Sequence, residues 1–287
     1  MGLLRLIDRT LRLAKTPSRI PDRVSVYLKH RRVLFERTPA LHPIRKRRIA
    51  AARRAAEAYF RDDPGRAAVL AAARRSISTG AELTDYYLLH RYIVMRRPRR
   101  VLEFGSGVTT LVMAHALAVS HRGAGVAGHL YSLEAIPRFH ENVKEILPDA
   151  LRAYVTLICS PRREEIWRGE IWGFGYSELP PGPFDLVFVD GPTEYRDDEA
   201  VRCGIKGVCL DLLDLLERDA DGRLDVVVDQ KFNSLEAYET VLPRGTVRYD
   251  PVMDVGVLAG VHGRLLTARR RPARNRYGDA WRMLGLR

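Results

Sequence analysis

Short apolar runs alternate with longer amphipathic segments from Arg100 onward. Apolar runs of this kind, separated by helical patterns, are typical of the strands of a doubly wound parallel sheet. The predicted strands are 100–104, 129–133, 154–159, 184–189, 224–228, about 246–249, and 255–260 with 264–268. No long helical pattern separates the last two runs, so we expect the sheet to finish with an antiparallel hairpin. The sequence thus predicts an α/β fold with a doubly wound, seven-stranded, mostly parallel sheet.

A helical extension precedes the strand pattern. Residues 1–19 predict a short basic amphipathic helix, whose apolar positions at helical spacing are Leu3, Leu4, Ile7, Leu11 and Ala14. Such a helix either lies on a membrane surface or docks on its own protein, and docking is the favoured alternative. Further helical patterns cover about 43–60, 64–76 and 82–96. We therefore expect a basic helical extension over 1–80, an α/β domain over 81–270 and a basic tail over 271–287.

Glycine and proline are densest over 173–183, between two predicted strands. This composition predicts a loop over the edge or the carboxyl end of the sheet. The longer segment 161–183 and the helical extension are expected to form the groove that selects the substrate.

The net charge of +13 is concentrated at the two ends of the chain. Residues 1–75 carry a balance of +14 and residues 264–287 a balance of +7, which leaves −8 for the middle. Basic ends of this kind attract nucleic acid, anionic lipid or an acidic polymer. The alternative is that an arginine-rich composition covers ordinary solvated helix faces, and the sequence leaves both open.

The composition excludes several classes of protein. With 46% hydrophobic and 29% charged residues, the chain is neither disordered throughout nor collagenous. No uncharged apolar run approaches the roughly 20 residues that span a bilayer, so we expect a soluble or peripheral protein. The cysteines are Cys159, Cys203 and Cys209, and they form no CxxC pair. Their spacing argues against a zinc finger and favours a reducing cytoplasm. Cys203 and Cys209 are expected as packing residues on a helical run.

The strongest motif follows the first predicted strand, where Gly105 and Gly107 lie just before a helical run. Glycines at this point permit a tight turn and close approach of a ligand to the backbone, and a helix that starts near Thr109 offers unpaired N–H groups. The second predicted strand ends in Glu134, whose carboxylate can accept hydrogen bonds from both hydroxyls of a ribose. The pattern predicts a nucleotide cradle for a dinucleotide or for S-adenosylmethionine.

This segment resembles the class I S-adenosylmethionine-dependent methyltransferases, whose first motif is a strand with an acidic residue just before G-x-G. The resemblance covers about residues 84–268. It differs from the dinucleotide fingerprint because Thr110 takes the place of the third small residue, which argues against a nicotinamide dehydrogenase. The resemblance implies that Glu103, with the backbone of Gly105, Ser106 and Gly107, holds the methionine part of the cofactor.

The same resemblance gives roles to two further residues. Glu134 would hold the ribose, and Ser160, which follows the third strand, would lie near the adenine. A purely structural turn is the alternative for Ser160. Tyr86 and Tyr87, on the helix before the first strand, either close over the cofactor or belong to the core.

Two acidic residues follow later strands at the same rim of the sheet. Asp190 ends the fourth predicted strand and Asp229 the fifth, followed by Gln230 and Lys231. Ligands of open α/β sheets bind at this rim. We expect Asp190 as the catalytic base or substrate-orienting group, with Asp229 and Lys231 as second choices; Lys231 would stabilise a developing alkoxide.

The pair of acids also resembles the magnesium ligands of small-molecule O-methyltransferases of the catechol type. Gln230 stands where that group has Asn, and the lysine base expected after the fourth strand is missing. A divalent metal is therefore not favoured, because a longer side chain displaces the ligand oxygen from a site that tolerates little movement.

The predicted activity is S-adenosylmethionine-dependent methylation, with a hydroxyl of a small molecule or saccharide as the acceptor. Two alternatives stay open: an RNA methyltransferase that uses the basic ends as a clamp, and a non-catalytic cofactor-binding or membrane-peripheral scaffold. The oligomeric state is not encoded in any readable pattern.

Overall fold

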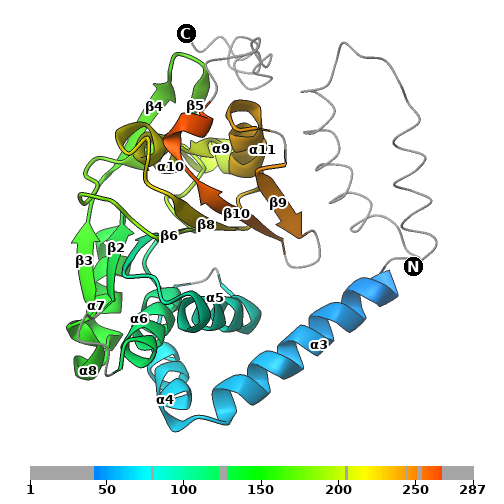
Figure 1. Cartoon of the computed structure of the whole chain (residues 1–287), viewed down its shortest axis with the longest axis vertical. Coiled ribbons are helices and arrows are strands. Elements are labelled where there is room, and N and C mark those ends of the chain that lie inside the picture. Colours follow the sequence, from blue (N-terminus) through cyan, green and yellow to red (C-terminus); the bar gives the residue numbers. More distant parts are fainter. Residues whose placement is uncertain are drawn as a thin grey trace.

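The computed structural model describes residues 42–78, 81–122, 128–203, 206–243, 245–250 and 254–266 (Figure 1). The predicted amphipathic helix over 1–19 and the basic tail over 271–287 lie outside these ranges. The division of the chain at residue 80 stays a prediction.

A seven-stranded sheet forms the centre of the molecule, in the order β3-β2-β1-β6-β8-β10-β9. Its strands are β1 (Arg100–Phe104), β2 (His129–Glu134), β3 (Val155–Cys159), β6 (Leu186–Val189), β8 (Leu224–Asp229), β9 (Val247–Asp250) and β10 (Val255–Val261). The neighbours of β1, β2 and β6 are all parallel, whereas β10 runs antiparallel to both β8 and β9. The predicted fold class is therefore confirmed, including the antiparallel end of the sheet.

Helices cover both faces of this sheet (Figure 1). Val101 of β1 packs with the helices on one face, and its neighbour Leu102 packs with those on the other. Because successive side chains of a strand point to opposite faces, a strand covered on both faces needs apolar residues on both, which Val101, Leu102 and Phe104 of β1 provide. The helices are α6 (Val108–Ser120), α7 (Pro137–Ile146), α8 (Asp149–Arg152), α9 (Asp198–Cys203), α10 (Asp211–Arg218) and α11 (Phe232–Val241).

The helices that precede the sheet form where the sequence predicts them: α3 (His42–Arg61), α4 (Pro64–Ala73) and α5 (Leu83–Arg96). α4 begins at Asp63, whose Oδ1 accepts a hydrogen bond from the backbone N–H of Arg66 at 2.8 Å. A cap of this kind, followed by proline at the first helical position, is a strong helix start. Phe60 and Val69 pack against α6, so α3 and α4 share a core with the helix that follows β1.

The prediction of a loop over 173–183 is wrong in its first part. β4 (Arg162–Trp167) and β5 (Ile171–Tyr176) form an antiparallel hairpin, and β5 also pairs in parallel with β7 (Val208–Cys209). Gly173 is needed there because a Cβ atom would lie 2.1 Å from the carbonyl oxygen of Val208. The glycines that suggested a loop therefore permit close strand pairing.

Two smaller predictions also need correction. The described part of the predicted run 264–268 does not continue the sheet, since Gly263–Leu265 form a short 3-10 helix after β10. Residues 267–268 lie outside the described ranges. Cys209 lies in the short strand β7 and not on a helix; its side chain is buried, as a packing residue requires. The side chain of Cys203 lies outside the described part of the structure.

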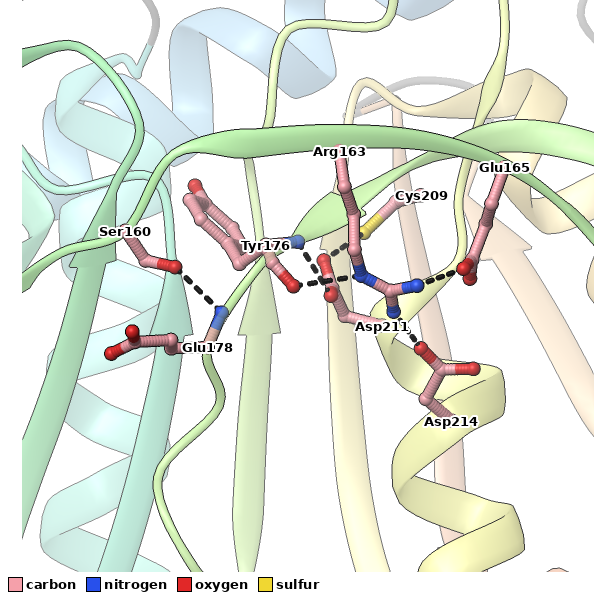
Figure 2. Close-up of polar contacts among 8 residues, drawn as sticks. All are labelled: Ser160, Arg163, Glu165, Tyr176, Glu178, Cys209, Asp211 and Asp214. Atoms are coloured by element: carbon pink, nitrogen blue, oxygen red, sulfur yellow. Dashed lines mark hydrogen bonds and ion pairs between the residues drawn. The ribbon is translucent and has the colours of Figure 1, made fainter.

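A buried polar cluster fastens the β4–β5 hairpin to α10 (Figure 2). Oδ1 of Asp211 accepts the backbone N–H of Tyr176 at 2.8 Å, and Nε of Arg163 donates to the carbonyl of Tyr176 at 2.9 Å. The remaining guanidinium nitrogens of Arg163 bind Glu165 and Asp214. Asp211 has no exposed surface, and burial raises the pKa of its carboxyl to about 7. The end of β5 is thus fixed by groups from two other elements.

We expect Asp211→Ala to lower the free energy of unfolding by about 2–3 kcal/mol, because the buried N–H of Tyr176 loses its acceptor. Asp211→Asn keeps an acceptor oxygen and should lose less than about 1 kcal/mol at pH 6, where a carboxyl with a pKa near 7 is mostly neutral. Urea unfolding of both variants measures the difference. Equal losses would contradict the role of this acceptor.

Candidate functional site

A cavity of ≈180 Å³ lies at the carboxyl ends of the central strands. Its walls come from the segments after β1, β2, β6 and β8, together with β5 and the start of α5. Among the described residues, those that line it are Ser78, Ala81, Tyr86, Gly105, Ser106, Gly107, Val108, Thr109, Glu134, Ile136, Phe139, Tyr176, Asp190, Gly191, Pro192, Thr193 and Lys231. Open α/β sheets bind their ligands at this position.

The floor of the cavity is a close contact between two backbone turns. Gly105 has a φ of 95°, a conformation that favours glycine, and a Cβ atom there would lie 2.8 Å from the backbone nitrogen of Gly191. The N–H of Gly191 donates to the carbonyl of Phe104 at 2.5 Å. The turn after β1 and the turn after β6 therefore touch without side chains between them. This contact places Asp190 beside the glycine turn.

Glu103 lies beneath the glycine turn and does not line the cavity. It is fully buried, and its carboxylate accepts hydrogen bonds from the hydroxyls of Thr109 at 2.5 Å and of Thr110 and Ser132 at 2.6 Å. Burial raises the pKa of Glu103 to about 7, although the three hydroxyls act in the opposite direction. The geometry makes Glu103 the group that fixes the turn and the start of α6. The predicted contact with the methionine part of the cofactor stays a prediction.

Glu134 lies where the sequence predicts it, at the end of β2 and in the cavity wall. One of its oxygens, Oε1, accepts the backbone N–H of Ile136 at 2.9 Å, and burial raises the pKa of the carboxyl. Ile136 and Phe139 add an apolar wall next to this carboxylate. The arrangement suits a ribose bound at the acid and a flat, weakly polar ring bound beside it.

Ser160 lies behind the wall and does not line the cavity. Its side chain is fully buried, and its Oγ accepts the backbone N–H of Glu178 at 2.9 Å (Figure 2). The backbone N–H of Ser160 donates to the carbonyl of Glu134. This geometry supports the structural-turn alternative, in which Ser160 positions Glu134 and does not contact a ligand.

Asp190 and Lys231 both line the cavity, whereas Asp229 lies in the interior at the end of β8. Burial raises the pKa of Asp190 to about 6, and Lys231 acts against that shift. Asp229 is only 1% exposed, and neither of its carboxylate oxygens has a hydrogen-bond partner among the described residues. Burial raises its pKa to about 8, with a further contribution from the charge of Asp85.

The sequence does not single out Asp85 or Tyr176. Asp85 follows the start of α5, and burial raises its pKa to about 6. Tyr176 comes from β5, stacks on Phe104 with ring centroids 5.7 Å apart, and donates its hydroxyl to the carbonyl of Leu133 at 3.3 Å. Oδ2 of Asp85 accepts the backbone N–H of Glu82 at 2.7 Å, so Asp85 caps α5 and does not line the cavity. No local motif marks Tyr176, because it reaches the cavity through the pairing of β5 with β4 and β7.

Of the two tyrosines before the first strand, Tyr86 lines the cavity and Tyr87 does not. The hydroxyl of Tyr86 donates to the carbonyl of Ala81 at 2.9 Å. Within the described ranges, no three His, Cys, Asp or Glu side chains are grouped so that they could hold a metal ion. No helix of these ranges is long and apolar enough to cross a membrane.

A pair of glycine variants tests the contact between the two turns. Gly245 also has a positive φ, 86°, but a Cβ atom there meets nothing within 4 Å, so Gly245→Ala carries backbone strain alone. We expect Gly105→Ala to lower the free energy of unfolding by about 2 kcal/mol more than Gly245→Ala, because the added methyl group pushes the turns apart. Thermal unfolding of both variants provides the comparison, and equal losses would argue against the contact.

The unpartnered carboxyl of Asp229 leads to a pH-dependent prediction. Its folded-state pKa of about 8 lies above the usual 3.8. As the pH rises from 3.8 to about 8, the unfolded state releases the proton of this carboxyl while the folded state keeps it, so the free energy of unfolding falls. Asp229→Asn removes this loss and should raise the free energy of unfolding at pH 8.5 by on the order of 2 kcal/mol, with a smaller gain at pH 6. Urea titrations at both pH values check it, with the exposed Asp62→Asn as the control. A gain that does not grow with pH would contradict the assignment.

Comparisons with known proteins agree with this geometry. Residues 102–224 match a family described as a methyltransferase domain. Comparison with curated protein sequences finds no match.

Among solved structures, a methyltransferase from Geobacter sulfurreducens is 16% identical with a TM-score of 0.42, over 68% of this chain and 88% of that one. The O-methyltransferase TomG from Streptomyces achromogenes is 18% identical with a TM-score of 0.39, over 68% and 90% of the two chains. A putative caffeoyl-CoA O-methyltransferase from Staphylococcus aureus is 11% identical with a TM-score of 0.43, over 75% and 99%. Likenesses this distant transfer no activity, so the identification depends on the family match. On that match, residues 102–224 form a methyltransferase domain, and this segment holds the glycine turn, Glu134 and Asp190.

Proposed function

We propose that the enzyme methylates a hydroxyl oxygen of a small molecule or saccharide, with Asp190 as the general base. One observation carries the proposal: Asp190 lines the same cavity as the glycine turn and Glu134. A base in that position lies within the space that a bound nucleoside and its acceptor would share. General-base help of this kind contributes roughly 10²–10⁴-fold in rate.

The residues around the cavity suit S-adenosylmethionine. The N–H groups of Gly105 and Gly107 donate to the carbonyl of Leu133 and the hydroxyl of Thr110 and hold the turn in place. Val108 and Thr109, in the first turn of α6, line the cavity, and N–H groups at a helix start suit the carboxylate of the methionine part. Glu134 would bind the ribose hydroxyls, and Ile136 with Phe139 would contact the adenine. When bound, the cofactor supplies a methyl group that its sulfonium charge already activates.

Asp190 is better suited than Asp229 to accept the proton of the acceptor hydroxyl. At pH 7 a carboxyl with a pKa near 6 is mostly ionised, whereas one with a pKa near 8 is mostly protonated. Asp229 also lies in the interior and does not line the cavity, so it would not take the proton of a bound acceptor. Lys231, which lines the cavity with Asp190, would stabilise the negative charge that develops on the oxygen.

The walls contribute by holding the acceptor in line with the methyl group. Alignment of two reactants in a fixed site can supply about 7–11 kcal/mol of the barrier. Tyr86 and Tyr176 enclose the cavity from opposite parts of the chain, and Asp211 fixes the backbone of Tyr176. These side chains exclude water and orient the acceptor without taking part in proton transfer.

The cytoplasm is the compartment that we propose for this reaction. Cys159 and Cys209 are free thiols, and Cys159 is exposed. An exposed free thiol is typical of proteins in a reducing compartment.

We expect Asp190→Asn to lower kcat by about 10²–10⁴-fold while the affinity for S-adenosylhomocysteine changes little. The wild-type rate should rise about tenfold per pH unit below pH 6 and level off above it, since the base has a pKa of about 6, and the variant should lose this rise.

The measurement uses S-adenosylmethionine with a radiolabelled methyl group and fractionated cell extract, followed by calorimetry with S-adenosylhomocysteine. Label in a small molecule or saccharide identifies the acceptor class, and Asp190→Glu should recover part of the rate. Label in RNA, or a normal rate for Asp190→Asn, would overturn the proposal.

A further inference from the structure

A surface shared by α3 and α5 combines exposed arginines with exposed large apolar side chains. We propose that this surface, the α3–α5 face, binds the headgroup region of an anionic lipid membrane. It is made of Arg47, Arg48 and Arg54 from α3 and of Leu88, Arg91 and Met95 from α5, all of which are exposed. Figure 1 shows α3 as a long helix on the outside of the molecule, with α5 next to it.

Arg47 and Arg54 are arginines of α3 that stay without an ion-pair partner among the described residues. They are seven residues apart, so they lie on the same side of the helix. Arg48 pairs with Asp250 at 3.5 Å, but both side chains are exposed, at 57% and 41%, so the pair stays accessible to another anion. Glu57 is the one acidic residue of α3.

α5 adds an apolar stripe beside these charges. Leu88 and Met95 are seven residues apart with Arg91 between them, which puts the three side chains on one face of the helix. Leu88 is 43% exposed and Met95 is 71% exposed, the largest fraction among the exposed large apolar residues. Isolated exposed leucines are ordinary in soluble proteins, but an apolar stripe bordered by arginines marks an interaction surface.

A groove joins the two helices into one surface. Arg48, Ala51 and Ala52 of α3 face Thr84, Tyr87 and Leu88 of α5 across a cavity of ≈320 Å³. Its walls are mostly apolar, with the guanidinium of Arg48 at one side. A groove of this composition suits a lipid, whose phosphate would meet the arginine while the upper part of an acyl chain enters between the helices.

The chemistry of this face favours lipid over nucleic acid. Nucleic-acid surfaces combine basic groups with polar side chains and exposed aromatic rings on which bases stack. Here the exposed apolar groups are Leu88 and Met95, which insert readily between lipid headgroups. The anionic leaflet also attracts clustered arginines in proportion to their number.

Vesicle flotation of the full chain tests the proposal. The probes are phosphatidylcholine vesicles with and without about one-third phosphatidylserine. We expect binding only to the anionic vesicles, and the double variant Arg47→Glu with Arg54→Glu should bind them at least about 25-fold more weakly. The matched control is Arg122→Glu with Arg223→Glu, which makes the same charge change at two exposed arginines outside α3 and α5.

The apolar stripe has its own test. Leu88→Ser with Met95→Ser should weaken vesicle binding about tenfold or more without changing net charge, whereas the exposed Ile166→Ser on β4 should not. Circular dichroism and calorimetry with S-adenosylhomocysteine confirm that each variant is folded. The proposal is overturned if the α3 double variant binds anionic vesicles as tightly as its control, or if the protein binds uncharged vesicles equally well. It is also overturned if the serine variant binds vesicles as tightly as the wild type while the arginine variant loses affinity for duplex RNA.

Discussion

The contact between the turn after β1 and the turn after β6 is the constraint on which the site depends. A Cβ atom at Gly105 would collide with the backbone of Gly191, and a Cβ atom at Gly191 would collide with the backbone of Gly105. Both positions therefore require glycine. The contact gives the cavity a floor made only of backbone and brings Asp190, the last residue before Gly191, next to the glycine turn. A parallel sheet supplies the common rim, but this close approach determines how near Asp190 lies to the glycine turn.

Two buried carboxyl groups, those of Glu103 and Asp229, have opposite surroundings. Glu103 is surrounded by three hydroxyl donors, so its charge strengthens the connection between β1, β2 and α6. Asp229 is equally buried but has no hydrogen-bond donor within the described ranges, and burial raises the pKa of its carboxyl to about 8. A fold retains an unsatisfied group of this kind at a cost in stability, and such costs are concentrated where a ligand completes the arrangement. The first carboxyl holds the site together, whereas the second stays unpaired in the interior next to it, as far as the described residues show.

The sequence predicts those parts of the site that are local along the chain. The strand pattern alone brings four residues to one rim, because each lies at the end of a strand or within two residues of it: Gly105, Glu134, Asp190 and Lys231. Ser160 obeys the same rule, yet its hydroxyl turns away to bind the backbone of Glu178, a contact that spacing cannot show. Tyr176 reaches the cavity only because β5 pairs with β4 and β7. Glycines such as Gly173 predict a loop in this segment, whereas the structure uses Gly173 for close strand pairing. Long-range strand pairing is therefore where prediction from sequence failed.

α5 has two functional sides. Tyr86 points to the cavity, while Leu88, two residues later and hence on another side of the helix, belongs to the outer groove with α3. A rigid helix transmits rotation along its whole length, so a tilt that seats its outer side more deeply would also swing the tyrosine ring at the mouth of the cavity. The rate of methyl transfer would then depend on whether the α3–α5 face is occupied. Through α5, binding at the surface would be coupled to the reaction in the cavity.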